Sequence, residues 1–151
     1  MTEPYDTDLL QNEILQKVSN AKTKAEKVKL LTEHRNDALV SIIIWNYDDS
    51  LKTLLPEGEV PYTPNDAPVG TEHTRLRQEH RKFYNFLKGG NDGLQQTARE
   101  RMFIQMLEGL SKGEAELMCL VKDKKLQERY KITFNVIKEA YPDIVWGGRG
   151  S

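Results

Sequence analysis

The chain has 151 residues, of which 30% are charged and 38% hydrophobic, and its formal net charge at pH 7 is −1. This length fits one domain with its own core, and the composition excludes a disordered tail. The near-neutral charge excludes a protein that is basic over its whole surface, so any binding of a polyanion must come from local clusters of cations. The single cysteine, Cys119, excludes an internal disulfide and is typical of a reducing cytoplasm. No apolar run is long enough to span a bilayer, and the acidic residues after Met1 do not resemble a secretion leader, so we expect neither a membrane span nor secretion.

The first third of the chain predicts three helices. Residues 1–6 are expected to form a flexible arm, and from Thr7 onward apolar residues recur every four positions, as on one face of a helix. The segment Thr23-Lys24-Ala25-Glu26 has the pattern of a capping box, which predicts a second helix that ends near His34. A third helix is expected over residues 36–47, although its β-branched residues leave a buried strand as the alternative.

Residues 48–70 are expected to form a long irregular loop. Prolines and glycines that regular elements tolerate poorly fall within it: Pro56, Pro61, Pro64, Pro68, Gly58 and Gly70. A loop of this length in a small domain is usually functional or mobile. It is also acidic, since Asp48, Asp49, Glu57, Glu59 and Asp66 face only Lys52. Its apolar residues indicate that it packs onto the domain.

The second half of the chain predicts four further helices and no hairpin. The expected helices cover residues 71–88, 91–107, 111–121 and 133–141, with a turn at 127–129. The third of them begins with a second capping-box pattern, Ser111-Lys112-Gly113-Glu114. We therefore expect an all-α protein, a compact bundle of about six to seven short helices in a single domain at 7–146. Residues 147–151 are expected to be a flexible tail.

No motif in the sequence predicts catalysis or cofactor binding. His73 and His80 lie about two helical turns apart, too far to share a metal ion without a third ligand. Cys119 stands among apolar residues, which favours a place in the core over a role as nucleophile. Asp48-Asp49 lacks the glycine spacing of a calcium loop, and no phosphate-binding loop is present. We expect no enzyme activity, no metal site and no cofactor; an enzyme built on the two histidines and the loop acids is the least favoured alternative.

Three clusters of lysines and arginines lie near expected helix ends or turns, where free backbone N–H groups help to hold phosphates. The candidate DNA contacts are Lys22, Lys24, Lys27, Arg75, Arg77, Arg81, Lys122, Lys124 and Lys125. For each cluster the alternative is a solvated surface paired with acids. If the clusters meet on one surface, away from the acidic loop, the chain binds duplex DNA through its phosphates with little dependence on base sequence.

A protein–protein interaction module is the second function that the sequence leaves open. The Pro-rich loop would then be the contact surface, with apolar and aromatic anchors at Leu54, Leu55, Tyr62 and Trp146. The sequence predicts no oligomeric state.

Several segments match a known order of motifs. They are Thr23–Leu31, Asn36–Leu39 leading into Trp45-Asn46-Tyr47, Glu116–Leu126 and Val136–Ile144. Together they resemble the N-terminal helical DNA-binding domain of the ATP-dependent DNA ligases of T-even-type phages. Further segments, Leu55-Pro56-Glu57-Gly58, Pro61-Tyr62 and Lys88-Gly89-Gly90-Asn91-Asp92, are similar to a family of short uncharacterised proteins of T-even-like tailed phages.

The ligase resemblance implies a helical fold that grips the backbone of duplex DNA across the minor groove. It implies no ligation, because adenylation needs a lysine in a Lys-x-Asp-Gly setting, and Asp92-Gly93 has Gly90 in place of that lysine. What it implies is a non-catalytic accessory protein of phage replication, repair or transcription in the host cytoplasm. If the chain is instead a protein–protein interaction module, its partner is a host or phage protein.

Overall fold

The computed structural model describes residues 9–65, 68 and 72–149, so the arm expected at residues 1–6 lies outside it. The described part contains seven α-helices and no strands, which confirms the all-α fold. The helices are α1 (Gln11–Asn20), α2 (Lys24–Glu33), α3 (Asp37–Tyr47), α4 (Leu76–Glu79), α5 (Gln96–Gly109), α6 (Lys112–Lys122) and α7 (Phe134–Ala140), with the 3-10 helices η2 (His80–Phe86) and η3 (Leu126–Glu128). Among the helices of this part, none has the length and apolar character needed to cross a bilayer.

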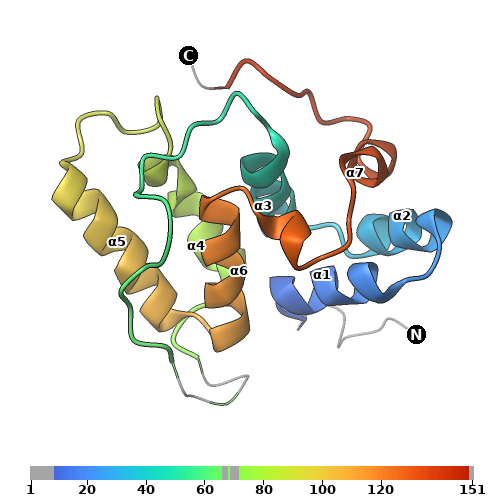
Figure 1. Ribbon diagram of the computed structural model, residues 1–151, viewed down its shortest axis with the longest axis horizontal. Helices are drawn as coiled ribbons and strands as arrows, with labels where there is room; N and C mark the ends of the chain where they lie inside the picture. The colour runs from blue at the N-terminus through green and yellow to red at the C-terminus, as the bar shows by residue number, and fades with distance from the viewer. Residues whose placement is uncertain (1–8, 66–67, 69–71, 150–151) are drawn as a thin grey trace.

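Helix α3 lies between two groups of helices and is the centre of the core. In Figure 1, α4, α5 and α6 lie to one side of it, and α1, α2 and α7 to the other. Ile42, Ile43 and Trp45 are fully or almost fully buried, and Trp45 packs edge-on against Phe83 with ring centroids 5.2 Å apart. A helix that is apolar on nearly every side is stable only when other apolar elements surround it and exclude water. That burial explains why residues 36–47 form a helix although their composition also suits a strand.

Local capping signals fix the starts of three helices where the sequence places them. The side chain of Thr23 accepts a hydrogen bond from the Glu26 amide at 3.1 Å, at the start of α2. Asn36 accepts one from the Leu39 amide at 2.9 Å, at the start of α3. Ser111 accepts one from the Glu114 amide, at the start of α6. Each hydroxyl or amide oxygen satisfies one of the N–H groups that a helix leaves free at its first turn.

Glu114 departs from the capping-box prediction. Its carboxylate does not turn back to the start of α6; it is fully buried and accepts the backbone N–H groups of Gln11 at 2.9 Å and Leu76 at 3.0 Å. These are the first residues of α1 and α4. A single buried carboxylate therefore caps two helices that lie far from it in sequence.

The prediction of one long helix over residues 71–88 is wrong. Because the Leu76 amide is bonded to Glu114, α4 begins only there, and its turns tighten into the 3-10 helix η2, which ends at Phe86. The Phe86 carbonyl accepts the Leu54 amide at 2.8 Å, and Thr53 forms an isolated bridge with Leu87. The irregular segment after α3 thus ends this helix by taking its last backbone groups. The next helix also starts later than expected, at Gln96.

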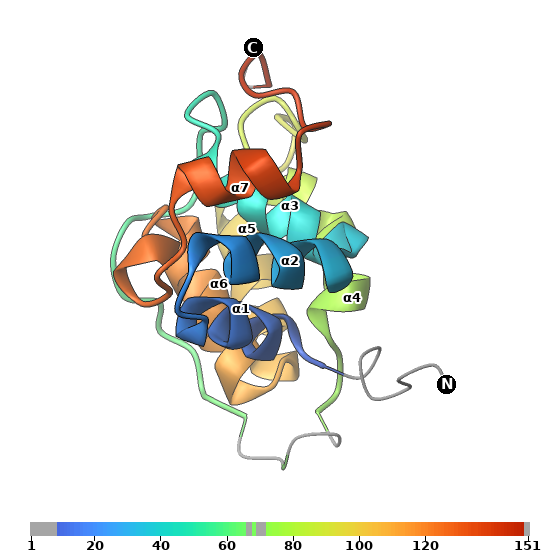
Figure 2. The same cartoon turned by 90° about the vertical axis from the view of Figure 1, so that its right-hand side faces the viewer.

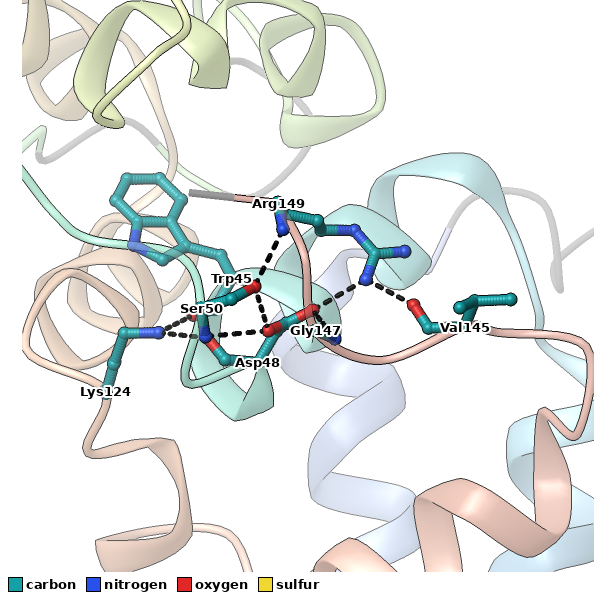
Figure 3. A network of polar contacts seen from close by, with 7 residues as sticks. All are labelled: Trp45, Asp48, Ser50, Lys124, Val145, Gly147 and Arg149. Atoms are coloured by element: carbon teal, nitrogen blue, oxygen red, sulfur yellow. Dashed lines mark hydrogen bonds and ion pairs between the residues drawn. The ribbon is translucent and has the colours of Figure 1, made fainter. Parts of the chain in front are cut away.

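The end of the chain is fastened to the end of α3 as far as residue 149 (Figure 3). Asp48 accepts the Gly147 amide at 3.0 Å and the Arg149 guanidinium at 2.6 Å, and Ser50 accepts the Arg149 amide at 3.0 Å. These bonds correct the expectation of a flexible tail for residues 147–149; residues 150–151 lie outside the described part. Trp146, just before them, packs edge-on against Phe134.

Candidate nucleic-acid interface

The first lysine cluster surrounds the turn from α1 into α2. Lys22 and Lys24 are exposed, while Lys27 is half-buried. Lys24 Nζ lies 3.2 Å from Glu139 of α7, and both side chains are 56% exposed. Such a solvated ion pair is weak and leaves the lysine free to exchange its partner for a phosphate. The turn therefore presents its cations to solvent beside α7.

A second segment, residues 129–134, lies against this turn and adds to its charge. The Lys131 amide donates to Ser19 Oγ at 2.9 Å, and the Lys131 carbonyl accepts from Lys27 Nζ, so the Lys131 backbone is held beside α1 and α2 while its side chain is exposed. Lys138 lies on the exposed side of α7 with its Nζ 5.0 Å from the Phe134 ring centroid. We call the resulting set the lysine face. It consists of Lys22, Lys24, Lys27, Lys131 and Lys138.

A hollow of about 390 Å³ opens within the lysine face. Lys27 and Lys131 line it together with Tyr47, Phe134 and other residues of the 127–134 segment. The Tyr47 and Phe134 rings stack with centroids 5.9 Å apart, and the Tyr47 hydroxyl donates to the Ile132 carbonyl at 2.7 Å. Burial raises the pKa of Tyr47 to about 12, so this hydroxyl remains a neutral donor near pH 7. Two aromatic rings and two lysines thus line one hollow.

The acidic loop lies away from the lysine face. In Figure 1 the segment after α3 runs along the side of α5 and α6, whereas α1, α2 and α7 form the other side of the molecule. The described carboxylates of that segment are Asp48, Asp49, Glu57 and Glu59. Those of α1, α2 and α7 are Glu13, Glu26, Glu33 and Glu139, of which Glu13 accepts the Leu10 amide and Glu26 the Thr23 hydroxyl. A chain of net charge −1 therefore has one locally basic side.

The second cluster lies at the opposite end of α2 from Lys24. Arg75 is paired with Glu72 at 3.0 Å. Arg77 and Arg81 line a separate hollow at the first residues of α3. This cluster does not join the lysine face.

Lys122 and Lys124 of the third cluster bond backbone carbonyls inside the protein and do not present their cations to solvent. Lys122 is 2% exposed, and its Nζ donates to the carbonyls of Pro56 and Gly58 and to Asp123. Lys124 Nζ donates to the carbonyls of Trp45 and Asp48 at 2.8 and 2.7 Å, and burial lowers its pKa. Lysines near a helix C-terminus bond its last carbonyls in this way. Of the expected DNA contacts in this cluster, only Lys125 is exposed.

The three clusters therefore do not converge as expected. Lys124 binds the C-terminal end of α3, whereas Arg77 and Arg81 lie at its N-terminal end. Lys131, which belongs to the third basic cluster of the sequence but is not among the expected DNA contacts, joins the first cluster instead. Lys138, which sequence reasoning missed, joins it too. Lys131 stands two residues before the cap Thr133, much as Lys22 stands before Thr23, and this resemblance could have pointed to it. No local pattern marks Lys138, because its place follows from the packing of α7 on α2.

The expected protein-binding anchors are partly covered. Leu55, Tyr62 and Trp146 pack against the core, and Leu54, also half-buried, donates its amide to Phe86. Burial raises the pKa of Tyr62 to about 12. In the described part the large apolar side chains that are well exposed are Tyr84 and Val145, neither of them an expected anchor. Interaction through the loop remains a prediction.

The candidate catalytic residues are dispersed. Over residues 9–65, 68 and 72–149, no group of three or more His, Cys, Asp or Glu side chains is placed to hold a metal ion. His73 is exposed, and His80 is half-buried beside Ser41 Oγ at 3.4 Å. Cys119 is half-buried, and burial raises the pKa of its thiol, which favours the unreactive protonated form.

Comparison with known proteins identifies the family of the chain. No curated protein and no solved structure matches the chain. A model of a family of unknown function, DUF6433, matches residues 14–128, which include most of α1, all of α2 to α6 and the acidic segment between α3 and α4. The chain therefore belongs to this family of unknown function.

Proposed function

We propose that the protein is a non-catalytic accessory protein that binds duplex DNA through its backbone phosphates on the lysine face. The observation that carries the proposal is the contact between residues 22–27 and 131–139. Lys27 bonds the Lys131 carbonyl, and Lys24 reaches Glu139 beside Lys138. Cations from two distant segments thus form one surface, as phosphate binding requires.

The chemistry of this surface favours contacts that do not read bases. Lysine ammonium groups act as mobile point charges, and they neutralise phosphates without the bidentate geometry that arginine uses to read guanine. Four of the five lysines are exposed and reach outward from a rigid support of helices, whereas the Lys27 ammonium bonds the Lys131 carbonyl and holds the two segments together. Binding should therefore depend strongly on salt and weakly on DNA sequence.

The resemblance to the DNA-binding domain of phage DNA ligases supports the same proposal. It suggests a role in phage replication, repair or transcription inside the infected cell, with no ligation step. Interaction with a protein through the acidic segment is the less favoured function, because Leu55 and Tyr62 are engaged in packing.

Fluorescence anisotropy with a short labelled duplex tests the proposal. The test variant carries Lys22→Gln, Lys24→Gln and Lys131→Gln, which remove three exposed cations from the lysine face. The control carries Lys52→Gln, Lys88→Gln and Lys112→Gln, which remove three exposed cations elsewhere. We expect the test variant to bind roughly tenfold or more weakly at low salt, since three phosphate contacts are lost, and the control to bind almost as wild type.

Two results would contradict the proposal. Absence of binding by the wild-type protein even at low salt would remove the function. An equal loss of affinity in both variants would show that net charge alone matters and that no defined surface is used.

A further inference from the structure

Arg77 and Arg81 stand out among the arginines of the described part because they have neither an ion pair nor a hydrogen bond. Arg101, an exposed residue of α5, is the third such residue. The others are engaged: Arg35 with Asp143, Arg75 with Glu72, Arg99 with Asn85, Asn91 and Gln96, Arg129 with Glu116, and Arg149 with Asp48. Two guanidinium groups that line one hollow without an ion pair repel each other, and a bound anion reduces that repulsion.

The hollow has a volume of about 330 Å³ and lies at the first residues of α3. Its other lining residues are Asn36, Asp37, Ala38 and His80. Asn36 caps the Leu39 amide, and within the described residues no group accepts the amides of Asp37 and Ala38. The two arginines thus face the positive end of an 11-residue helix.

Arg77 supplies the strongest reason to expect an occupant. Its Nε is buried and has no hydrogen-bond partner among the described residues, although Arg77 lines the hollow. A buried cationic N–H without an acceptor is costly, and an anion in the hollow offsets this cost through its charge and through the other N–H groups of the guanidinium. The acceptor has to be small and must offer several oxygens, because two guanidinium groups and a helix end point at one place.

The charge of the hollow limits the kind of anion. Asp37 also lines it and offsets one of the two guanidinium charges. Burial, and then the neighbouring Arg81, lower the pKa of His80, so its ring is neutral at pH 7. One net positive charge remains, together with the dipole of α3. This balance suits a phosphate group better than a polyphosphate.

We propose that this hollow binds a single phosphate group, held by Arg77 and Arg81 and by the N-terminal amides of α3. The site is separate from the lysine face: in Figure 2, α2 crosses the view, and α4 and the start of α3 lie beyond the C-terminal end of α2. The proposal rests on the unpaired arginines and the free amides at the start of α3, and it does not depend on the proposed function.

A titration with inorganic phosphate, followed by the amide resonances of Asp37 and Ala38, tests the site. We expect saturable shifts in the wild-type protein and in the control variant Arg101→Gln. The variant Arg81→Gln changes an exposed side chain and should fold normally; we expect it to weaken binding about tenfold or more, because a charge-assisted hydrogen bond is lost. Arg77→Gln should have a comparable effect. Shifts that do not saturate, or that are the same in Arg81→Gln as in wild type, would overturn the proposal.

A second titration distinguishes a free phosphate from a phosphate of a DNA backbone. A short duplex is titrated into wild-type protein and into Arg81→Gln. Weaker binding of the duplex by the variant would assign the hollow to a backbone phosphate. Loss of inorganic phosphate binding with unchanged duplex binding would assign it to a free phosphate. Failure of the lysine-face variants to affect DNA binding would leave the phosphate result standing.

Discussion

Arg149 Nη1 lies 2.6 Å from Asp48 Oδ2, and this ion pair joins residues 101 positions apart in the chain (Figure 3). The Asp48 carboxylate is almost fully buried, with its other oxygen accepting from the amide and hydroxyl of Ser50. Lys124 bonds the Asp48 carbonyl from the opposite side. The end of α3 is therefore a junction at which the acidic segment, the end of α6 and the end of the chain are held together.

This junction predicts a loss of stability in acid. Burial alone raises the pKa of Asp48, but hydrogen bonds from Ser50, Gly147 and Arg149 outweigh it and lower the pKa to about 2. Because the pKa is lower in the folded state, the stabilisation is present above the unfolded value of about 3.9 and is lost as pH falls toward 2. It amounts to about 2 kcal/mol.

The Asp48→Asn variant tests this loss, because its side chain does not ionise. We expect the variant to be less stable at neutral pH and to lose less stability than wild type between about pH 5 and pH 2. Urea denaturation across this range measures both effects. Asp49→Asn, which changes an exposed neighbour, is the control. Parallel pH curves for Asp48→Asn and wild type would contradict the role assigned to Asp48.

Glu114→Gln should destabilise the fold by about 1–3 kcal/mol at neutral pH. A glutamine offers only one acceptor oxygen, so its NH₂ group would face the amide of Gln11 or of Leu76 and leave that amide unpaired. Urea denaturation measures the loss. Glu116→Gln, which breaks a partly exposed pair with Arg129, should change the unfolding free energy by less than about 1 kcal/mol. Equal effects of the two substitutions would show that Glu114 does not hold the two helix starts.

The pH dependence of Glu114 has the opposite sign to that of Asp48. Burial raises the pKa of Glu114, and the hydrogen bonds from Gln11 and Leu76 only partly offset this. The folded state therefore binds the proton more tightly than the unfolded state, and this contribution to stability declines as pH rises above the unfolded pKa. We expect Glu114→Gln to lack that decline. Titration of the Glu114 carboxyl carbon by NMR checks the direction, and a pKa below the ordinary value would contradict it.

Gly90 and Gly93 form a matched pair that tests the packing around η2. A Cβ atom at Gly90 would lie 2.0 Å from the Tyr84 carbonyl oxygen, whereas one at Gly93 meets nothing within 4 Å. We expect Gly90→Ala to destabilise the protein by about 1–3 kcal/mol, because the backbone must shift. Gly93→Ala should be neutral or stabilise by up to about 1 kcal/mol. Thermal denaturation compares them, and similar melting temperatures would contradict the close approach at Gly90.

Features set by neighbouring residues were predictable from the sequence, and features set by distant ones were not. Thr23 and Asn36 cap the helices that follow them, because the oxygen and the amide that it accepts are three residues apart. Glu114 follows the same local pattern, yet the folded chain brings the starts of α1 and α4 to its carboxylate. That tertiary contact also explains why no helix spans 71–88.

The same distinction applies to the lysines. Lys22 and Lys124 look alike in sequence, since each stands in a basic cluster near the end of a helix. Lys22 is exposed, while the ammonium of Lys124 bonds the last carbonyls of α3. Which lysine remains available to a phosphate depends on whether unpaired carbonyls lie within its reach. Only the packed structure determines that.

The salt dependence of DNA binding tests the central claim most directly. The logarithm of the association constant, plotted against the logarithm of the salt concentration, has a slope of about −0.9 for each phosphate contact. If the lysine face binds the backbone, the variant lacking the Lys22, Lys24 and Lys131 charges should show a slope that is shallower by about 2 to 3, while the variant lacking those of Lys52, Lys88 and Lys112 keeps the wild-type slope. A slope unchanged in the first variant would contradict phosphate binding on this face.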